Sequence, residues 1–202
     1  GGALSSLNMA RVGARADTLF ADRQARSGHM PLWSAGKNAK EFRAALGPKP
    51  VGGIFSVGVE ERYRWKDSVQ VAPEVELWVA EATANGLRPW FTKFGAVLHD
   101  RRWLEPVATI YDWHYAHEHY LRNTTSLATV ALVYSQNTAQ MVGPAEVHNR
   151  VEDHALGMYQ ALIEARIPFD MLHEAHLDAE HLKRYRAVIL PNIAALSDDA
   201  CA

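Results

Sequence analysis

The stretch EERYRWKDSVQ, residues 60–70, gathers acidic, basic and aromatic side chains directly behind the apolar run VGGIFSVG. Glu60 and Glu61 supply adjacent carboxyl groups, which suit proton transfer or nucleophilic attack. An aromatic ring then stands among hydrogen-bonding groups: Arg64, Trp65, Lys66 and Asp67. Composition alone leaves two interpretations open, a solvated turn or the floor of a polar site.

Two other apolar runs also end in polar residues. Asp22 closes the run TLFAD, and Arg23, Gln24 and Arg26 follow it. Lys93 stands near the end of LRPWFTKF, three residues after Trp90. Because successive side chains on a strand alternate, we expect Trp90 and Lys93 on opposite faces. Asp22 is expected either to form a buried ion pair with an arginine or to contact a ligand. Lys93 is expected to point either to a ligand or to a carboxylate.

The apolar periodicity predicts α/β structure before residue 125. We expect strands within 16–26 and over 51–58 and 87–94, and helices over 33–47, 73–86 and 101–121. Strands that alternate with helices imply parallel pairing, with functional residues at the carboxyl ends of the strands. Asp22, the stretch 60–70 and Lys93 should therefore meet at one edge of a sheet.

A second block repeats the alternation and predicts a flavodoxin-like or amidotransferase-like parallel α/β domain. The apolar run 127–134 is typical of a strand buried on both faces. A helix over 151–167, a strand over 168–174, a helix capped by Asp178 and a strand over 186–193 should follow, and Ser197 suits the N-cap of another helix. The boundary between the blocks is expected near residues 122–126. Both ends of the sequence look cut, so we expect a fragment.

Composition excludes several classes of protein. Lys plus Arg number 21 and Asp plus Glu 23, so no nucleic-acid-binding stripe is indicated. No apolar run approaches the ~18 residues of a membrane span, and no signal peptide is recognisable at the start. Cys201 is the only cysteine, which excludes a disulfide framework. Localisation stays open, because an upstream signal would lie outside this sequence.

Five strings carry a resemblance to a known family: RYRWKDSVQ, NGLRPWFTKF, HEHYLRN, YQALIEARIPFDMLHE and VILPNIAALSDD. The chain resembles bacterial glycoside hydrolases in which a TIM barrel precedes a β-galactosidase trimerisation-type domain, similar in layout to family 42 β-galactosidases. The resemblance implies that residues 1–124 hold about strands six to eight of a (β/α)8 barrel. Residues 125–202 would then begin the trimerisation-type domain, which implies a homo-oligomer, for example a trimer.

The resemblance also implies roles for the polar residues. In such barrels the nucleophile follows strand seven, so Glu60 and Glu61 are the nearest matches, while the acid/base carboxylate follows strand four and lies upstream of this chain. Trp65 could stack on a sugar ring, with hydroxyl contacts from Asp22, Arg64, Lys66, Asp67 and Lys93. No cofactor is implied. Each role competes with a structural one, a solvated acidic loop for the glutamates and a salt-bridge cluster for the group around Trp65.

Two other motifs point away from chemistry. His114, His117 and Glu118 share a helix face, and two histidines at this spacing can bind zinc. A third ligand and a catalytic water site are not apparent, so surface or interdomain packing is the better interpretation. The second block lacks a glycine-rich phosphate cradle and a nucleophile elbow, which favours a module for assembly over a small-molecule binder. The predicted function is part of a hydrolase of O-glycosidic bonds. The alternative is a non-catalytic carbohydrate-binding or structural barrel protein.

Overall fold

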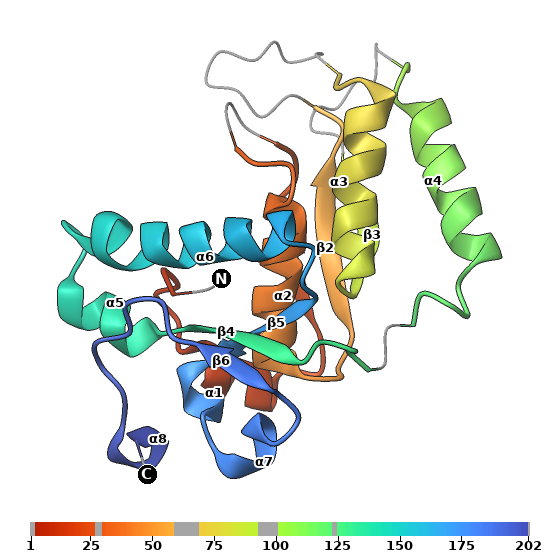
Figure 1. The fold of residues 1–202 in the computed structure, drawn as a ribbon. Helices are drawn as coiled ribbons and strands as arrows, with labels where there is room; N and C mark the ends of the chain where they lie inside the picture. The colour runs from red at the N-terminus through yellow and green to blue at the C-terminus, as the bar shows by residue number, and fades with distance from the viewer. Residues whose placement is uncertain (1–2, 27–29, 59–68, 93–100, 123–124, 202) are drawn as a thin grey trace. The chain divides into compact units, whose positions relative to one another are not determined.

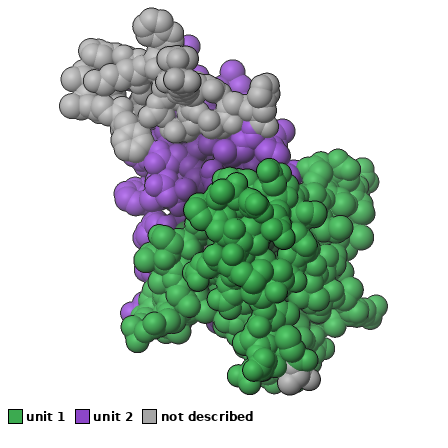
Figure 2. Space-filling model, turned by 90° about the vertical axis from the view of Figure 1, so that its left-hand side faces the viewer, with its two compact units in different colours: residues 1–16, 41–47, 125–202 green, residues 17–40, 48–124 purple. Residues whose placement is uncertain are grey.

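The computed structural model describes residues 3–26, 30–58, 69–92, 101–122 and 125–201. They form an α/β protein with two parallel three-stranded sheets (Figure 1). The chain divides into unit 2, residues 17–40 and 48–124, and unit 1, residues 1–16, 41–47 and 125–202 (Figure 2). The domain limits expected from the sequence, 1–124 and 125–202, stay a prediction.

The sheet of unit 2 has the order β1 (Leu19–Asp22), β2 (Val51–Ser56) and β3 (Leu87–Thr92). All pairs are parallel, as the strand–helix alternation predicted. The connecting helices are α2 (Ser34–Leu46) and α3 (Ala72–Ala84), and α4 (Leu104–Ala116) follows β3. Gly47 ends α2 with a φ of 64°, a left-handed conformation that glycine adopts without strain.

Helices α3 and α4 cover one face of this sheet (Figure 1). Buried Val51, Phe55 and Leu87 point to that face, opposite buried residues of the two helices: Val75, Trp78, Val79, Val107 and Ile110. Tyr111 of α4 packs edge-on against Phe91 and donates a hydrogen bond from its hydroxyl to the Pro89 carbonyl at 3.2 Å. The core of unit 2 therefore lies between the sheet and these helices.

The sheet of unit 1 has the order β5–β4–β6, with β4 (Val130–Tyr134) in the centre between β5 (Phe169–His173) and β6 (Ala187–Ile189). Both pairs are parallel. α6 (Asp153–Glu164) lies on one side of the sheet and α7 (Ala179–Leu182) on the other (Figure 1). A buried cluster on the α7 side contains Ala131, Val133, Leu172 and Leu177.

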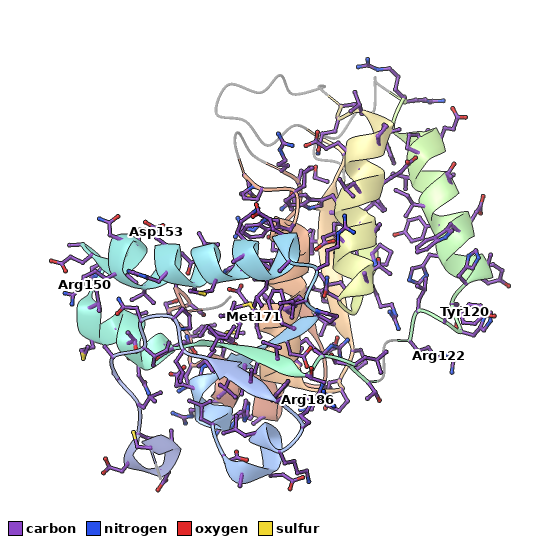
Figure 3. The ribbon with its side chains drawn as sticks, viewed as in Figure 1. Tyr120, Arg122, Arg150, Asp153, Met171 and Arg186 are labelled. Atoms are coloured by element: carbon purple, nitrogen blue, oxygen red, sulfur yellow. The ribbon has the colours of Figure 1, made fainter. Side chains whose placement is uncertain are left out.

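Short helices complete unit 1. They are α1 (Met9–Arg15), α5 (Gln136–Val142), η1 (His148–Glu152), η2 (Glu174–His176) and α8 (Asp198–Cys201). Figure 3 shows Arg150 in η1 and Asp153 at the start of α6. The Asp178 side chain caps α7 by accepting from the His181 N–H, and Ser197 accepts from the Ala200 N–H at the start of α8, both as predicted.

Three expectations from the sequence were wrong. The helix predicted over 101–121 extends only over α4, because His117 leaves the helical conformation as the C-cap and the chain continues in turns. Leu127 is 93% exposed, since β4 finds strand partners only from Val130 onward. The sequence predicted no helix between the strand at 127–134 and the helix at 151–167, but Ser135 caps α5 there by accepting from the Thr138 N–H.

Candidate functional site

The carboxyl ends of β1, β2 and β3 meet at one edge of the unit 2 sheet. Asp22 pairs in register with Ile54, and Ile54 with Trp90. Asp22 is exposed at this edge. The segments after β2 and β3, which contain the remaining candidate residues, leave from the same edge. Those residues lie outside the described ones, so their roles stay predictions: Glu60, Glu61, Arg64, Trp65, Lys66, Asp67 and Lys93.

Gln70 holds together the two ends of the segment after β2. Its backbone N–H donates to the Val57 carbonyl at 2.9 Å. Its side-chain Nε2 donates to the carbonyls of Gly58, at 2.8 Å, and Ser56, at 3.3 Å. The chain therefore returns beside the point where it left β2, and residues 58 and 70 both lie at the carboxyl edge. No pattern in the sequence indicates this role of a single glutamine.

The residues after Asp22 are fixed by neighbouring elements. The Arg23 carbonyl accepts from the buried Trp78 indole N–H at 2.9 Å, and the Gln24 carbonyl accepts from the Ser56 N–H at 2.8 Å. Arg26 lies 3.5 Å from the carboxylate of Glu74 in α3. The side-chain Oε1 of Gln24 is buried and has no hydrogen-bond partner among the described residues. This oxygen can still accept a hydrogen bond from a donor that reaches it.

An aromatic pair lies on the sheet face opposite α3 and α4. Phe20 and Trp90 are 50% and 52% exposed, and their rings meet edge-on at 5.3 Å. Gly52 lies beneath the Phe20 ring, because a Cβ at this position would stand 2.3 Å from a ring carbon. By register this face also carries Asp22 and Ile54. The strand pattern was used to place Trp90 opposite Lys93, and it did not single out Phe20, which alternation from Asp22 could have found.

The corresponding edge of the unit 1 sheet is closed by the chain itself. Buried Ser135, Gln136, Thr138, His173 and Glu174 follow or end β4 and β5. Thr138 Oγ1 accepts from the N–H groups of Ala194 and Ala195, at 3.2 and 3.0 Å. The crevice beside the central strand is where folds of this topology bind ligands. Here the backbone N–H groups of Ala194 and Ala195 are hydrogen-bonded to Thr138 at this edge.

The histidine-rich end of α4 shows no metal geometry. Among the described residues, no group of three or more His, Cys, Asp or Glu could hold a metal ion. Glu118 faces Arg122 at 3.9 Å, and Tyr120 and Arg122 lie beyond the end of α4 (Figure 3). Burial lowers the pKa of His114, and the nearby Arg88 lowers it further while Glu118 opposes both.

In the described ranges no helix is long and apolar enough to cross a membrane.

Comparison with known proteins identifies a likeness in fold. No family model matches the sequence, and a search among curated proteins finds no significant relative. A crystal structure of a β-galactosidase from Bacillus circulans sp. alkalophilus is similar, with a TM-score of 0.75 and 17% sequence identity. The likeness covers 94% of this chain and 30% of the β-galactosidase chain. This chain therefore has a fold similar to part of that β-galactosidase and spans under a third of its length.

Proposed function

We propose that this chain is part of a glycoside hydrolase that acts on O-glycosidic bonds. Residues 1–124 would supply about strands six to eight of a (β/α)8 barrel, and residues 125–202 the start of a trimerisation-type assembly domain. One observation carries the proposal: three parallel strands bring Asp22 and the segments after β2 and β3 to one edge, in a fold similar to a β-galactosidase. In barrels of this class, the active site lies at that edge.

Two carboxyl groups perform the proposed reaction. One protonates the leaving oxygen, and the other attacks the sugar or activates water, at separations of about 5–5.5 Å for retention and about 6.5–9.5 Å for inversion. Glu60 or Glu61 would supply the second group, and the acid/base carboxylate would come from another part of the parent protein. Asp22, Arg64, Lys66, Asp67 and Lys93 would contact sugar hydroxyls, with Trp65 stacking on a ring.

The alternative is a non-catalytic carbohydrate-binding or structural barrel. The observation in its favour is the exposed Phe20–Trp90 pair beside Asp22, since aromatic faces and polar groups suffice to bind a sugar without cleaving it. The assembly domain would make either protein a homo-oligomer. The hydrogen bonds of Ala194 and Ala195 to Thr138 at the strand-end edge of unit 1 support a structural role for that domain.

The test compares single substitutions in the complete parent protein. If one of the two glutamates is the nucleophile, Glu60→Gln or Glu61→Gln should lower the hydrolysis of aryl glycosides by about three orders of magnitude or more. Glu76→Gln, at an exposed position of α3, serves as control and should leave the rate unchanged. The isolated chain should show no turnover. Full activity in both glutamate variants would refute the nucleophile assignment, and saccharide binding without hydrolysis in the parent would favour the alternative.

A further inference from the structure

Residues 5–9, called the strap below, lie on the carboxyl edge of β4 and β5 in unit 1. The side chain of Gln136 holds them there through main-chain atoms. Its Nε2 donates to the carbonyls of Ser5 and Leu7, at 3.0 and 2.8 Å, and its Oε1 accepts from the Met9 N–H at 2.9 Å. The strap is thus bound through its backbone, by one buried amide that lies 127 residues or more along the chain from it.

His173 completes the hydrogen bonding of that amide. Its Nε2 lies 2.9 Å from Gln136 Oε1, and its Nδ1 accepts from the Ala175 N–H at 3.0 Å. Because Nδ1 must offer a lone pair to that N–H, the ring proton of the neutral imidazole is on Nε2, which donates to Gln136. The side chain of His173 is 3% exposed, so water does not replace these partners. The geometry therefore requires a neutral ring in a single tautomer.

If Nδ1 of His173 took up a proton from solvent, its new N–H would point at the N–H of Ala175. The bond from Ala175 to Nδ1 would then break, and the ring would have to move to relieve the contact. The carboxylate of Glu174, whose Oε2 lies 3.7 Å from Nδ1, is the acceptor in reach. A ring that turns toward Glu174 withdraws Nε2 from Gln136 and loosens the amide that holds the strap.

Among the titratable groups around His173, His173 itself is the one whose protonation bears on the strap, because its ring is hydrogen-bonded to Gln136. The Tyr134 ring packs edge-on at 5.2 Å, and burial, followed by Glu41 and Glu174, raises the pKa of its hydroxyl, which stays neutral. The ring of His176 lies 6.3 Å away, next to the pair of Asp178 and His181. Burial lowers the pKa of His173, with Glu174 opposing and His176 adding to the effect. The strap itself contributes no charged side chain.

We propose that the strap is a pH-sensitive latch, closed on Gln136 while His173 is neutral and opened when His173 takes up a proton. The direction follows from linkage. A histidine whose folded-state pKa is lowered stabilises the closed form fully above the pKa of the open form, about 6.5, and this contribution is lost as the pH falls below it. Opening would free residues that lead directly through α1 into β1. The latch is independent of glycosidase activity.

Hydrogen exchange of the full chain at pH ~7.5 and ~5, corrected for intrinsic rates, tests the latch. Between the pKa of the open form, about 6.5, and the folded-state pKa of His173, protection of the strap should fall by about tenfold for each pH unit. If the folded-state pKa lies below the lower pH, the fall continues to that pH. In His173→Gln, whose amide can still donate to Gln136, protection should be equal at both pH values. In Gln136→Ala the strap should be unprotected at both.

Two controls separate the latch from general acid unfolding. Protection of the β4 amides reports whether unit 1 remains folded in each variant. His176→Gln removes the neighbouring imidazole and should leave the pH response of the strap in place. Equal strap protection of the wild-type chain at both pH values would overturn the proposal without any variant. A pH response that persists in His173→Gln, or disappears in His176→Gln, would also overturn it.

Discussion

Removal of the Glu174 carboxylate is expected to destabilise unit 1 strongly. Glu174 is 5% exposed and accepts hydrogen bonds from the first backbone N–H groups of α5. The Gln136 N–H lies 3.1 and 3.0 Å from its two oxygens, and the Asn137 N–H lies 3.0 Å from Oε1. The carboxylate also faces the positive end of the helix dipole. The N-terminus of α5 therefore depends on a residue 37 or 38 positions along the chain.

The magnitude follows from the two N–H groups that lose an acceptor. A hydrogen bond to a charged group contributes about 1.5–3 kcal/mol, and a buried donor left without a partner costs a comparable amount. Glu174→Leu should therefore lower the free energy of unfolding of unit 1 by about 3–5 kcal/mol. Glu174→Gln keeps one carbonyl oxygen as acceptor and should cost about 1–2 kcal/mol.

The assay has to separate the two units. All six tryptophans lie between residues 33 and 113, within unit 2, so tryptophan fluorescence reports that unit. Native-state hydrogen exchange of the β4 and α6 amides reports unit 1. Glu180→Gln is the matched control, because the Glu180 and Lys183 side chains are 77% and 64% exposed and such a pair contributes less than about 1 kcal/mol. Equal protection in Glu174→Leu and Glu180→Gln would refute the reasoning.

Two further substitutions test the packing of each unit. Gly13→Ala would place a Cβ 1.8 Å from the Ala45 carbonyl oxygen, so α1 must shift. We expect the free energy of unfolding of unit 1, measured by hydrogen exchange, to fall by about 2 kcal/mol or more. Ala14→Ser, on the exposed side of α1, is the control. Trp78→Phe removes the indole N–H that donates to the Arg23 carbonyl and should lower the stability of unit 2 by about 1–3 kcal/mol in urea unfolding followed by the remaining tryptophans. An unchanged urea midpoint would show that this hydrogen bond does not stabilise the segment after β1.

The strands and most helices could be predicted because their signals are local. β2 and β3 are apolar runs bounded by glycine and proline, and α3 begins with Pro73 in its first turn and ends at Asn85. α5 was missed because its first residues are polar and the carboxylate at its start comes from Glu174, distant in sequence. Contacts of this range leave no periodicity in the sequence. α1 was missed although its start is local, since the Asn8 side chain caps it by accepting from the Arg11 N–H at 2.9 Å.

Strand order predicts at which edge of the sheet the candidate site lies, but not the contacts within it. Parallel pairing brings Asp22 to the edge from which the segments after β2 and β3 depart, and alternation predicts the faces of those strands. The hydrogen bonds of Gln70 to Ser56 and Gly58 depend on how the chain returns to the strand, which residue type alone does not specify. The exposure of Phe20 could not be predicted from residue type either, because it depends on which face of the sheet the helices cover.

The two sheets follow the same topological rule but differ at their carboxyl edges, and this difference separates the candidate site from the structural edge. At the unit 1 edge, Gln136 uses both donors and both acceptor positions of its side chain on the strap and His173, and Thr138 and Glu174 are likewise hydrogen-bonded within the chain. At the unit 2 edge, Asp22 is exposed, and Gln24 Oε1 is buried without a hydrogen-bond partner among the described residues. A polar group that is already satisfied gains nothing from a ligand, whereas an unsatisfied acceptor gains a hydrogen bond. The open acceptor of Gln24 and the exposed carboxylate of Asp22 support the proposal of a ligand site at the edge of β1, β2 and β3.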